Sequence, residues 1–337
     1  MPLIDDRLVT LAHGNGGQRG RTLIDEVFAR RLANPDLDTT LDAARLVLPP
    51  GEVLMTTDGF IVQPLEFPGG TIGSLAVHGT VNDLAVSGAD PVYLSLAAFI
   101  EEGFAIDRLD RIVASMAEAA AENGVRVACG DLKGLPRGEG SGVTFATTGL
   151  GVRRIGLQLG IGEVRPGDMV LVSGPVGDHG TAVLLAREQF GLRGDVRSDA
   201  GSVLPLTRAV RDLPGMRFMR DPTRGGLATV CHELADASGA TVRLEEDRLP
   251  IRAPVRGVCE MLGYDPLYLA CEGRVVALAD PVCAEAVLAA WRALPTGVEA
   301  ACVGEIAAGP SEVVLATALG GERLLPPLED DPLPRIC

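Results

Sequence analysis

Short segments with two different apolar periodicities alternate along the chain, and this alternation constrains the fold more than any other feature of the sequence. Segments rich in β-branched and apolar residues, typical of strands, cover residues 53–57, 93–100, 125–129, 143–152, 169–172, 242–244 and 313–316. Segments with a helical apolar period cover residues 71–87, 107–123, 181–189, 227–237 and 282–291. Strands separated by helices in this way indicate an α+β or α/β protein.

The pattern loosens between residues 153 and 165 and restarts at the turn sequence Pro166-Gly167-Asp168. A chain of 337 residues is also longer than one hydrophobic core usually supports. We therefore expect two domains, residues 1–155 and residues 156–323, followed by a flexible tail of residues 324–337.

The balance of charges excludes some classes of ligand. The net charge is -15, and the sequence has no basic stripe of the kind that nucleic-acid-binding domains carry. It has no uncharged apolar run of about 18 residues and no signal-peptide profile, so we expect a cytoplasmic protein without a membrane partner. An acidic chain still binds a phosphorylated ligand when Mg²⁺ supplies the positive charge.

The seven cysteines include no C-x-x-C pair, which argues against a zinc site or a disulfide framework. Six lie in apolar surroundings and are expected to be small core residues: Cys129, Cys231, Cys259, Cys271, Cys283 and Cys302. The four histidines are too scattered for a zinc site, and His179, which precedes Gly180, is expected in a turn.

Cys337 is the last residue of the sequence and follows a proline-rich, acidic segment. Pro326, Pro327, Pro332 and Pro334 restrict φ and favour an extended chain. At about 3.1 Å per residue, such a tail would carry the thiol roughly 40 Å from the body. The segment alone fits two interpretations equally, a nucleophile on a mobile arm and a frayed terminus.

Lys133 is the only lysine, whereas the other 29 basic residues are arginine. A codon bias towards arginine explains the 29, and it makes the one exception informative. Lysine loses its proton when its surroundings lower its pKa, and arginine effectively does not. Lys133 is therefore a candidate for proton transfer or for a compact positive charge.

Four aspartates stand beside glycine or a turn at the ends of expected elements: Asp58, Asp83, Asp131 and Asp221. Taken singly, each fits an ordinary turn. Gathered at one place, they would suit Mg²⁺, which prefers carboxylates together with substrate phosphates. Glu272 follows an apolar run and is a candidate base, with a turn residue as the alternative.

Two glycine-rich stretches would let a phosphate approach the backbone. The first begins at His13 and contains Gly14, Gly16 and Gly17; it matches neither a P-loop nor a dinucleotide fingerprint, so a flexible loop is the alternative. The second, Arg224-Gly225-Gly226, opens an expected helix, whose N-terminus would favour an anion.

Together these motifs resemble the HypE family of hydrogenase maturation proteins, in the superfamily of aminoimidazole ribonucleotide synthetase and selenophosphate synthetase. The resemblance runs essentially end to end. It rests on His13-Gly14-Asn15-Gly16-Gly17, Thr57-Asp58-Gly59, residues 77–85, Gly130-Asp131-Leu132-Lys133, residues 220–227 and Pro334-Arg335-Ile336-Cys337. The terminal motif is specific to the HypE family. Leu132 stands where the family has threonine, so no hydroxyl role is expected there.

The resemblance implies a two-domain α+β fold of the aminoimidazole ribonucleotide synthetase type. The N-terminal domains of two chains would pair into a shared β-barrel, with ATP near the interface of this homodimer. Cys337 would receive a carbamoyl group from a HypF-like carbamoyltransferase. ATP would drive dehydration of the thiocarbamate to a thiocyanate, and the cyano group would pass to iron on a HypC–HypD-type scaffold during maturation of a nickel–iron hydrogenase.

The resemblance also distributes the site residues among three roles. Catalysis falls to Cys337, Lys133 and Glu272, and Mg²⁺ to Asp58, Asp83, Asp131 and Asp221. ATP binding falls to His13, Gly14, Gly16, Gly17, Thr57, Thr80, Asn82, Thr223, Arg224, Gly225 and Gly226. Two alternatives remain: a small-molecule ATP-dependent synthetase of the aminoimidazole ribonucleotide or selenophosphate type, and a non-enzymatic scaffold whose tail cysteine docks a metal or a partner.

The role of the terminal thiol gives a first prediction. Cys337→Ala should leave the fold and nucleotide binding intact, because the residue lies outside every expected element, but should abolish modification. Intact-mass analysis with carbamoylating enzyme and ATP should show a carbamoyl adduct that then loses one water in the wild type alone. Adduct formation in the variant would contradict the assignment.

Overall fold

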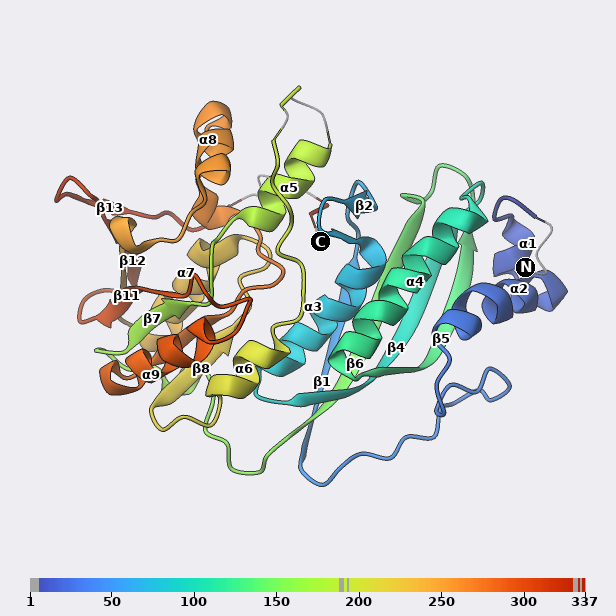
Figure 1. The fold of residues 1–337 in the computed structure, drawn as a ribbon, viewed down its shortest axis with the longest axis horizontal. Helices are drawn as coiled ribbons and strands as arrows, with labels where there is room; N and C mark the ends of the chain where they lie inside the picture. Colours follow the sequence, from blue (N-terminus) through green and yellow to red (C-terminus); the bar gives the residue numbers. More distant parts are fainter. Residues whose placement is uncertain (1–5, 188–190, 193, 330–332, 334, 337) are drawn as a thin grey trace.

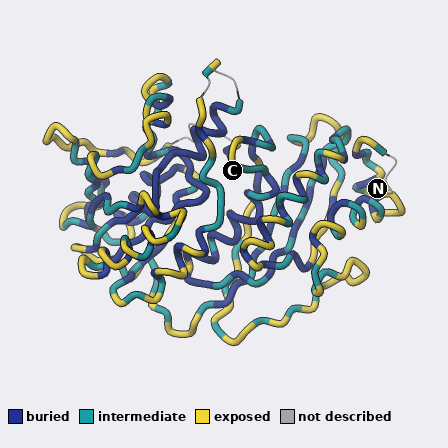
Figure 2. The backbone as a smooth tube through the Cα atoms, viewed as in Figure 1, coloured by how far each residue is buried: buried dark blue, intermediate teal, exposed yellow. Residues whose placement is uncertain are grey.

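The computed structural model describes residues 6–187, 191–192, 194–329, 333 and 335–336. Two β-sheets lie side by side, each covered by helices, and a long connection runs from the N-terminal helices beneath the first sheet to its first strand (Figure 1). The interior of both halves is buried, whereas this connection is mostly exposed or half-buried (Figure 2).

The first sheet has four strands in the order β1-β6-β4-β5. The strands are β1 (Glu52–Phe60), β4 (Asp90–Glu101), β5 (Arg126–Leu135) and β6 (Val143–Arg153). The β4–β5 pair is parallel, and the other two pairs are antiparallel. Helices α3 (Ile72–Val86) and α4 (Ile106–Asn123) pack on one face of this sheet (Figure 1).

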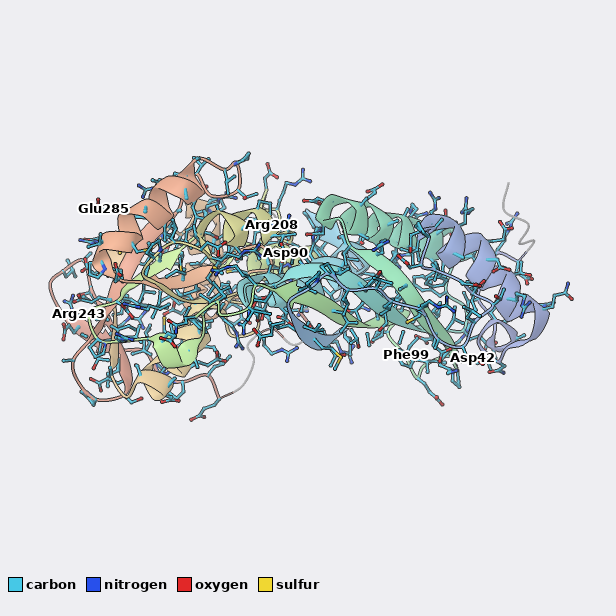
Figure 3. The ribbon with its side chains drawn as sticks, turned by 90° about the horizontal axis from the view of Figure 1, so that it is seen from below. Asp42, Asp90, Phe99, Arg208, Arg243 and Glu285 are labelled. Carbon is cyan, nitrogen blue, oxygen red and sulfur yellow. The ribbon has the colours of Figure 1, made fainter. Side chains whose placement is uncertain are left out.

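Among the residues that the structure describes, no helix packs on the opposite face of this sheet. Phe99 lies on the side of the sheet away from α4 (Figure 3). Val53 and Met55 of β1 are 50% and 72% exposed, and Phe99 and Leu150 are half-buried. A four-stranded sheet with one covered face therefore presents apolar side chains on the other.

The second sheet has seven strands in the order β13-β12-β9-β11-β7-β10-β8. They are β7 (Met169–Val172), β8 (Met216–Arg220), β9 (Thr241–Glu245), β10 (Val276–Ala279), β11 (Ala301–Ala307), β12 (Glu312–Ala316) and β13 (Glu322–Leu324). Only β9 and β12 pair in parallel. One core joins this sheet to α7 (Gly226–Ser238), and another joins it to α6 (Leu204–Val210) and α9 (Pro281–Arg292).

The two halves meet where α3 packs against α6. Asn82 of α3 is 1% exposed, and its side-chain amide makes three hydrogen bonds to the second half: it donates to the carbonyls of Gly201 and Glu272 at 3.0 and 3.1 Å, and it accepts from the Val203 N–H at 2.9 Å. Arg208 adds an ion pair to Asp90 at 2.7 Å, and both residues lie at this junction (Figure 3). A buried amide and an exposed ion pair thus link one half to the other.

All twelve expected strands and helices are present, with ends that differ by a few residues. The structure adds elements that the periodicity did not indicate: α1 (Leu11–Gly14), α2 (Gly17–Leu23), η1 (Ile24–Ala29), β2 (Glu66–Phe67), β3 (Gly70–Thr71), η2 (Ile161–Glu163), α6, β8, η3 (Glu246–Arg248), α8 (Ala253–Leu262), η4 (Pro266–Tyr268), β10, β11 and β13. His179 lies in the first turn of α5 (Asp178–Ala186), so the expectation of a turn is wrong.

Two expectations for the cysteines also need correction. Cys129 is exposed and Cys302 is half-buried, whereas Cys231, Cys259, Cys271 and Cys283 are buried. Cys129 points to the uncovered face of the first sheet because strand positions alternate between the two faces. Within the described residues, no helix is both long and apolar enough to cross a membrane.

The close packing of α3 on α4 gives a second prediction. A Cβ at Gly73 would lie 2.1 Å from the Ile112 carbonyl oxygen, so Gly73→Ala must separate the two helices. We expect the free energy of unfolding to fall by about 1–3 kcal/mol, measured by denaturant titration. Gly257→Ala, in α8 where nothing lies within 4 Å, is the matched control and should raise it by about 0.5–1 kcal/mol. A stable Gly73→Ala variant would contradict the packing.

Candidate functional site

Acidic side chains from both halves converge at the junction. Asp58 lies on β1, Asp83 on α3 and Asp221 directly after β8, while Glu272 lies in the connection before β10. The Thr56 hydroxyl donates to the Asp83 carboxylate at 2.8 Å. A Cβ at Gly79 of α3 would lie 3.9 Å from Asp58 Oδ2, so Asp58 packs against the same helix that carries Asp83.

The carboxylates of this acidic cluster are buried close to one another, which is electrostatically unfavourable. Burial raises the pKa of Asp221 to about 7, and repulsion from Asp83 adds to it. Burial also raises the pKa of Asp83 and that of Asp58, which still reaches solvent at the edge of the cluster. Arg220 and Arg224 oppose the shifts. The cluster therefore favours a bound cation or proton.

Glu272 is the most buried member, at 1% exposure. Burial, followed by repulsion from Asp221, raises its pKa well above the usual range. Its Oε1 atom has no hydrogen-bond partner within the described part of the chain. A buried polar atom left unsatisfied costs free energy, so this carboxylate is arranged for a group that binds it. Glu272 does lie in a bend, as the alternative expected, but it is buried there.

The second glycine-rich stretch begins α7 beside the cluster. Gly225 is the N-cap, and Gly226 has a φ of +59°. A Cβ at Gly226 would lie 2.5 Å from the Leu267 carbonyl oxygen, so only glycine fits. The positive end of the helix dipole favours an anion here. The backbone carbonyl of Thr223 stabilises this turn by accepting a hydrogen bond from the Gly226 N–H at 2.9 Å.

An open pocket of about 460 Å³ lies beside the cluster. Side chains from β1, α3, β6 and β8 line it, including Thr56, Asp83, Arg153, Arg220 and Asp221. Arg220 was not among the expected site residues, although it directly precedes the Asp-Pro-Thr-Arg motif. A pocket with both carboxylates and guanidinium groups can accommodate a phosphate together with its cation.

The remaining expected residues form a second group at the far edge of the first sheet. Asp131 and Lys133 lie on β5, are both exposed, and form an ion pair at 3.0 Å. α1 packs on β5 and brings His13 and Gly14 beside them, with Gly14 against Gly134. Two strands, β6 and β4, separate β5 from β1. Within one chain, Asp131 therefore does not join the other three aspartates.

Three expected ATP ligands are engaged in packing or hydrogen bonds. Thr80 is fully buried, with its hydroxyl on that of Thr147 between α3 and β6, so this placement does not support a nucleotide contact. The side-chain amide of Asn82 is used in the hydrogen bonds that join the two halves. Thr57 donates to the Thr147 carbonyl at 3.1 Å from the exposed side of β1. Gly16 and Gly17, with positive φ, face open space.

No three His, Cys, Asp or Glu side chains among the described residues stand close enough to hold a metal ion in this arrangement. The donor set nevertheless suits Mg²⁺, since Asp58, Asp83 and Asp221 supply oxygen ligands and a negative charge that Arg220 and Arg224 only partly offset. The assignment of these three aspartates to Mg²⁺ stays a prediction.

The described residues of the tail contact the body at two places. Leu328 lies over α7, with its Cδ2 atom 3.3 Å from the position of a Cβ on Gly225. Leu333 and Ile336 are buried in the core of the first sheet and α5. The expected free arm therefore does not describe these tail residues. Cys337 lies outside the described residues.

Both halves of the chain match models of known domain families. The N-terminal domain of AIR synthase related protein matches residues 41–153, and its C-terminal domain matches residues 165–316. The chain is 48% identical over 331 residues to carbamoyl dehydratase HypE of Azotobacter vinelandii, covering 98% of this chain and 97% of that protein.

Two solved structures are also similar. One is hydrogenase maturation protein HypE in complex with ATP, with a TM-score of 0.93, 44% identity and coverage of 97% of this chain and 99% of that chain. The other is a HypE–HypF complex, with a TM-score of 0.80, 40% identity and coverage of 91% and 99%.

The raised pKa of Asp221 gives a third prediction. Between about pH 4 and pH 7 the folded protein keeps a proton here that the unfolded chain loses, so the free energy of unfolding falls as pH rises through this range. The loss at pH 8 is at most about 4 kcal/mol. Asp221→Asn should shrink the difference in Tm between pH 5 and pH 8 in magnesium-free buffer. Asp247→Asn, at an exposed position, is the control and should keep the wild-type difference.

Proposed function

The chain belongs to the HypE family of carbamoyl dehydratases, and we propose that it uses ATP to dehydrate a carbamoyl group carried on Cys337 to a thiocyanate. The observation that carries the proposal is the acidic cluster, in which buried Glu272 has an unsatisfied carboxylate oxygen beside three further carboxylates. The relatives named carbamoyl dehydratase and the ATP complex of a similar HypE support it.

The reaction converts the S-carbamoyl group and ATP into S-cyanocysteine, ADP and phosphate. The amide oxygen attacks the γ-phosphoryl group, which turns a poor leaving group into phosphate. The two protons leave the nitrogen, the C–O bond breaks, and the nitrogen electrons complete the C≡N bond. The N-terminus of α7 and Arg220 would hold the phosphates, since both favour anions.

Two residues of this chain are suited to take the nitrogen protons. Glu272 has a raised pKa, and a carboxylate with a raised pKa is a stronger base than one in water. Lys133 is the second candidate, at the β5 edge. Mg²⁺, held by Asp58, Asp83 and Asp221, would neutralise charge on the phosphates when bound.

A homodimer would unite the two groups of site residues. β1 and β5 are the two edges of the first sheet, and its uncovered face exposes Val53 and Met55. Pairing two such sheets into a closed β-barrel buries this face and leaves no unpaired edge. With β1 of one chain beside β5 of the other, Asp131 and Lys133 of each chain lie near the acidic cluster of its partner.

The other expected partners belong to the same proposal. The HypE–HypF complex of a relative supports a HypF-like carbamoyltransferase as the loading enzyme. A HypC–HypD-type scaffold would accept the cyano group, and the cytoplasm is the compartment in which this sequence would meet both. Residues 1–155 would bind ATP and dimerise, residues 156–323 would complete the site, and the tail would carry the thiol.

Measuring ADP release with and without a carbamoylated tail tests the function. The carbamoylated wild type should release one ADP for each water lost from the adduct, and the unmodified protein should release little. ATP turnover on a free small molecule after removal of the last four residues would support the synthetase alternative. No ADP release under either condition would contradict an enzymatic role.

The shared site gives a fourth prediction. Lys133→Ala and Glu272→Gln should each abolish dehydration, because each removes one base. Co-refolded equimolar mixtures should recover about one quarter of the wild-type rate, since half the dimers are mixed and one of their two sites is intact. A mixture that stays inactive would place both groups in one chain's site. Unmixed variants refolded alone are the control.

A further inference from the structure

The docked tail contacts a buried histidine, His179, which lies outside the acidic cluster. His179 is fully buried at the start of α5. Its Nε2 atom lies 2.8 Å from the carbonyl oxygen of Ile336, and its Nδ1 atom lies 2.8 Å from the Ser198 hydroxyl. Phe67 packs edge-on against the imidazole, at 5.4 Å between ring centres, and fixes its plane.

These contacts determine which nitrogen carries the proton. A carbonyl oxygen only accepts, so His179 donates through Nε2 to Ile336 and accepts at Nδ1 from the Ser198 O–H. The Ser198 oxygen in turn accepts from the Ala200 N–H at 2.9 Å. Burial lowers the pKa of His179, which keeps the imidazole in this neutral form.

The neighbouring tail residues are held in the same way. The Arg335 carbonyl accepts from the Gln63 N–H at 3.3 Å and from Arg187 Nη2 at 2.6 Å. Leu333 and Ile336 are 5% and 3% exposed, so both side chains are anchored in the core. The rest of the protein therefore hydrogen-bonds to the carbonyls of Arg335 and Ile336, and the buried side chains of Leu333 and Ile336 anchor this segment.

The same loop connects the tail to the acidic cluster. Asp199, next to Ser198, accepts from the N–H groups of Glu272 and Gly273, each at 3.3 Å. Asp199 therefore holds the backbone of Glu272, and its neighbour Ser198 binds His179. A displacement of Ser198 would move the backbone that carries the proposed base.

We propose that His179 is a positioning residue that holds the tail docked for dehydration by binding the carbonyl of the residue before Cys337. The inference rests on the proposed function, and it adds that loading of the thiol requires this hydrogen bond to break. Removing the bond should shift the tail towards release, which favours loading and opposes dehydration.

Alkylation of the terminal thiol tests the tail directly, whatever reaction the protein catalyses. In a Cys129→Ser background, which removes an exposed thiol, N-ethylmaleimide labelling of Cys337 is followed by intact mass. His179→Leu should raise the labelling rate roughly tenfold, because a buried hydrogen bond is lost. His179→Gln, which can donate to the carbonyl and accept from Ser198, should stay within about twofold of the parent. His232→Leu in α7 is the matched control and should leave the rate unchanged.

The half-reactions separate positioning from general damage. His179→Leu should be loaded at least as fast as the parent, should lose water more slowly, and should keep the KM for ATP; His179→Gln should restore the dehydration rate. Equal labelling and dehydration in the parent and His179→Leu would overturn the proposal. If His179→Leu fails to fold, Ser198→Ala replaces it, and wild-type labelling of that variant would overturn the proposal. Absence of dehydration in the parent would instead refute the proposed function.

Discussion

The side-chain amide of Asn82 joins the two halves of the molecule, and the position of every residue in the acidic cluster depends on this joint. Both of its N–H groups and its oxygen are used, and the groups that it binds belong to the loops at residues 201–203 and at Glu272. Asp83, the next residue, faces the cluster. One turn of α3 thus holds the second half and contributes a carboxylate to the site. Together with the packing of α3 on α6 and the ion pair of Arg208 with Asp90, the joint sets the position of Asp58 and Asp83 relative to Asp221.

The joint brings like charges together at a cost in stability. Burial raises the pKa values of Asp58, Asp83, Asp221 and Glu272, and repulsion from neighbouring carboxylates adds to the rise for all of them except Asp83. Folding tolerates this because the junction is otherwise well packed, and because Arg220 and Arg224 offset part of the repulsion. A cation-bound nucleotide would relieve the rest, so the same interaction that weakens the empty protein would favour the ligand.

The sequence predicts those parts of the fold that have long, regular apolar periods. β4 and α4 were found because their buried positions repeat over many residues. α6 and α8 were missed because each is short and has a proline in its first turn, and β8 was missed because arginines interrupt it. At the site, a shared role was expected for Asp58, Asp83, Asp131 and Asp221, although Asp58 and Asp83 lie within β1 and α3 rather than in turns. Strand order cannot be read from the sequence, so the separation of Asp131 was not foreseen. The contact of His179 with the tail joins residues 157 positions apart and leaves no local signal.

Leu328 lies against Gly225, at the turn where α7 begins, so the tail and the segment that we propose to bind phosphate share a surface. Two binding events that share a surface are thermodynamically coupled, and the coupling is reciprocal. If docking of the tail changes the affinity for nucleotide by some factor, nucleotide binding changes the equilibrium constant for docking by the same factor. The cellular ratio of ATP to ADP would then bias the fraction of time for which the tail is docked, without any dedicated effector site.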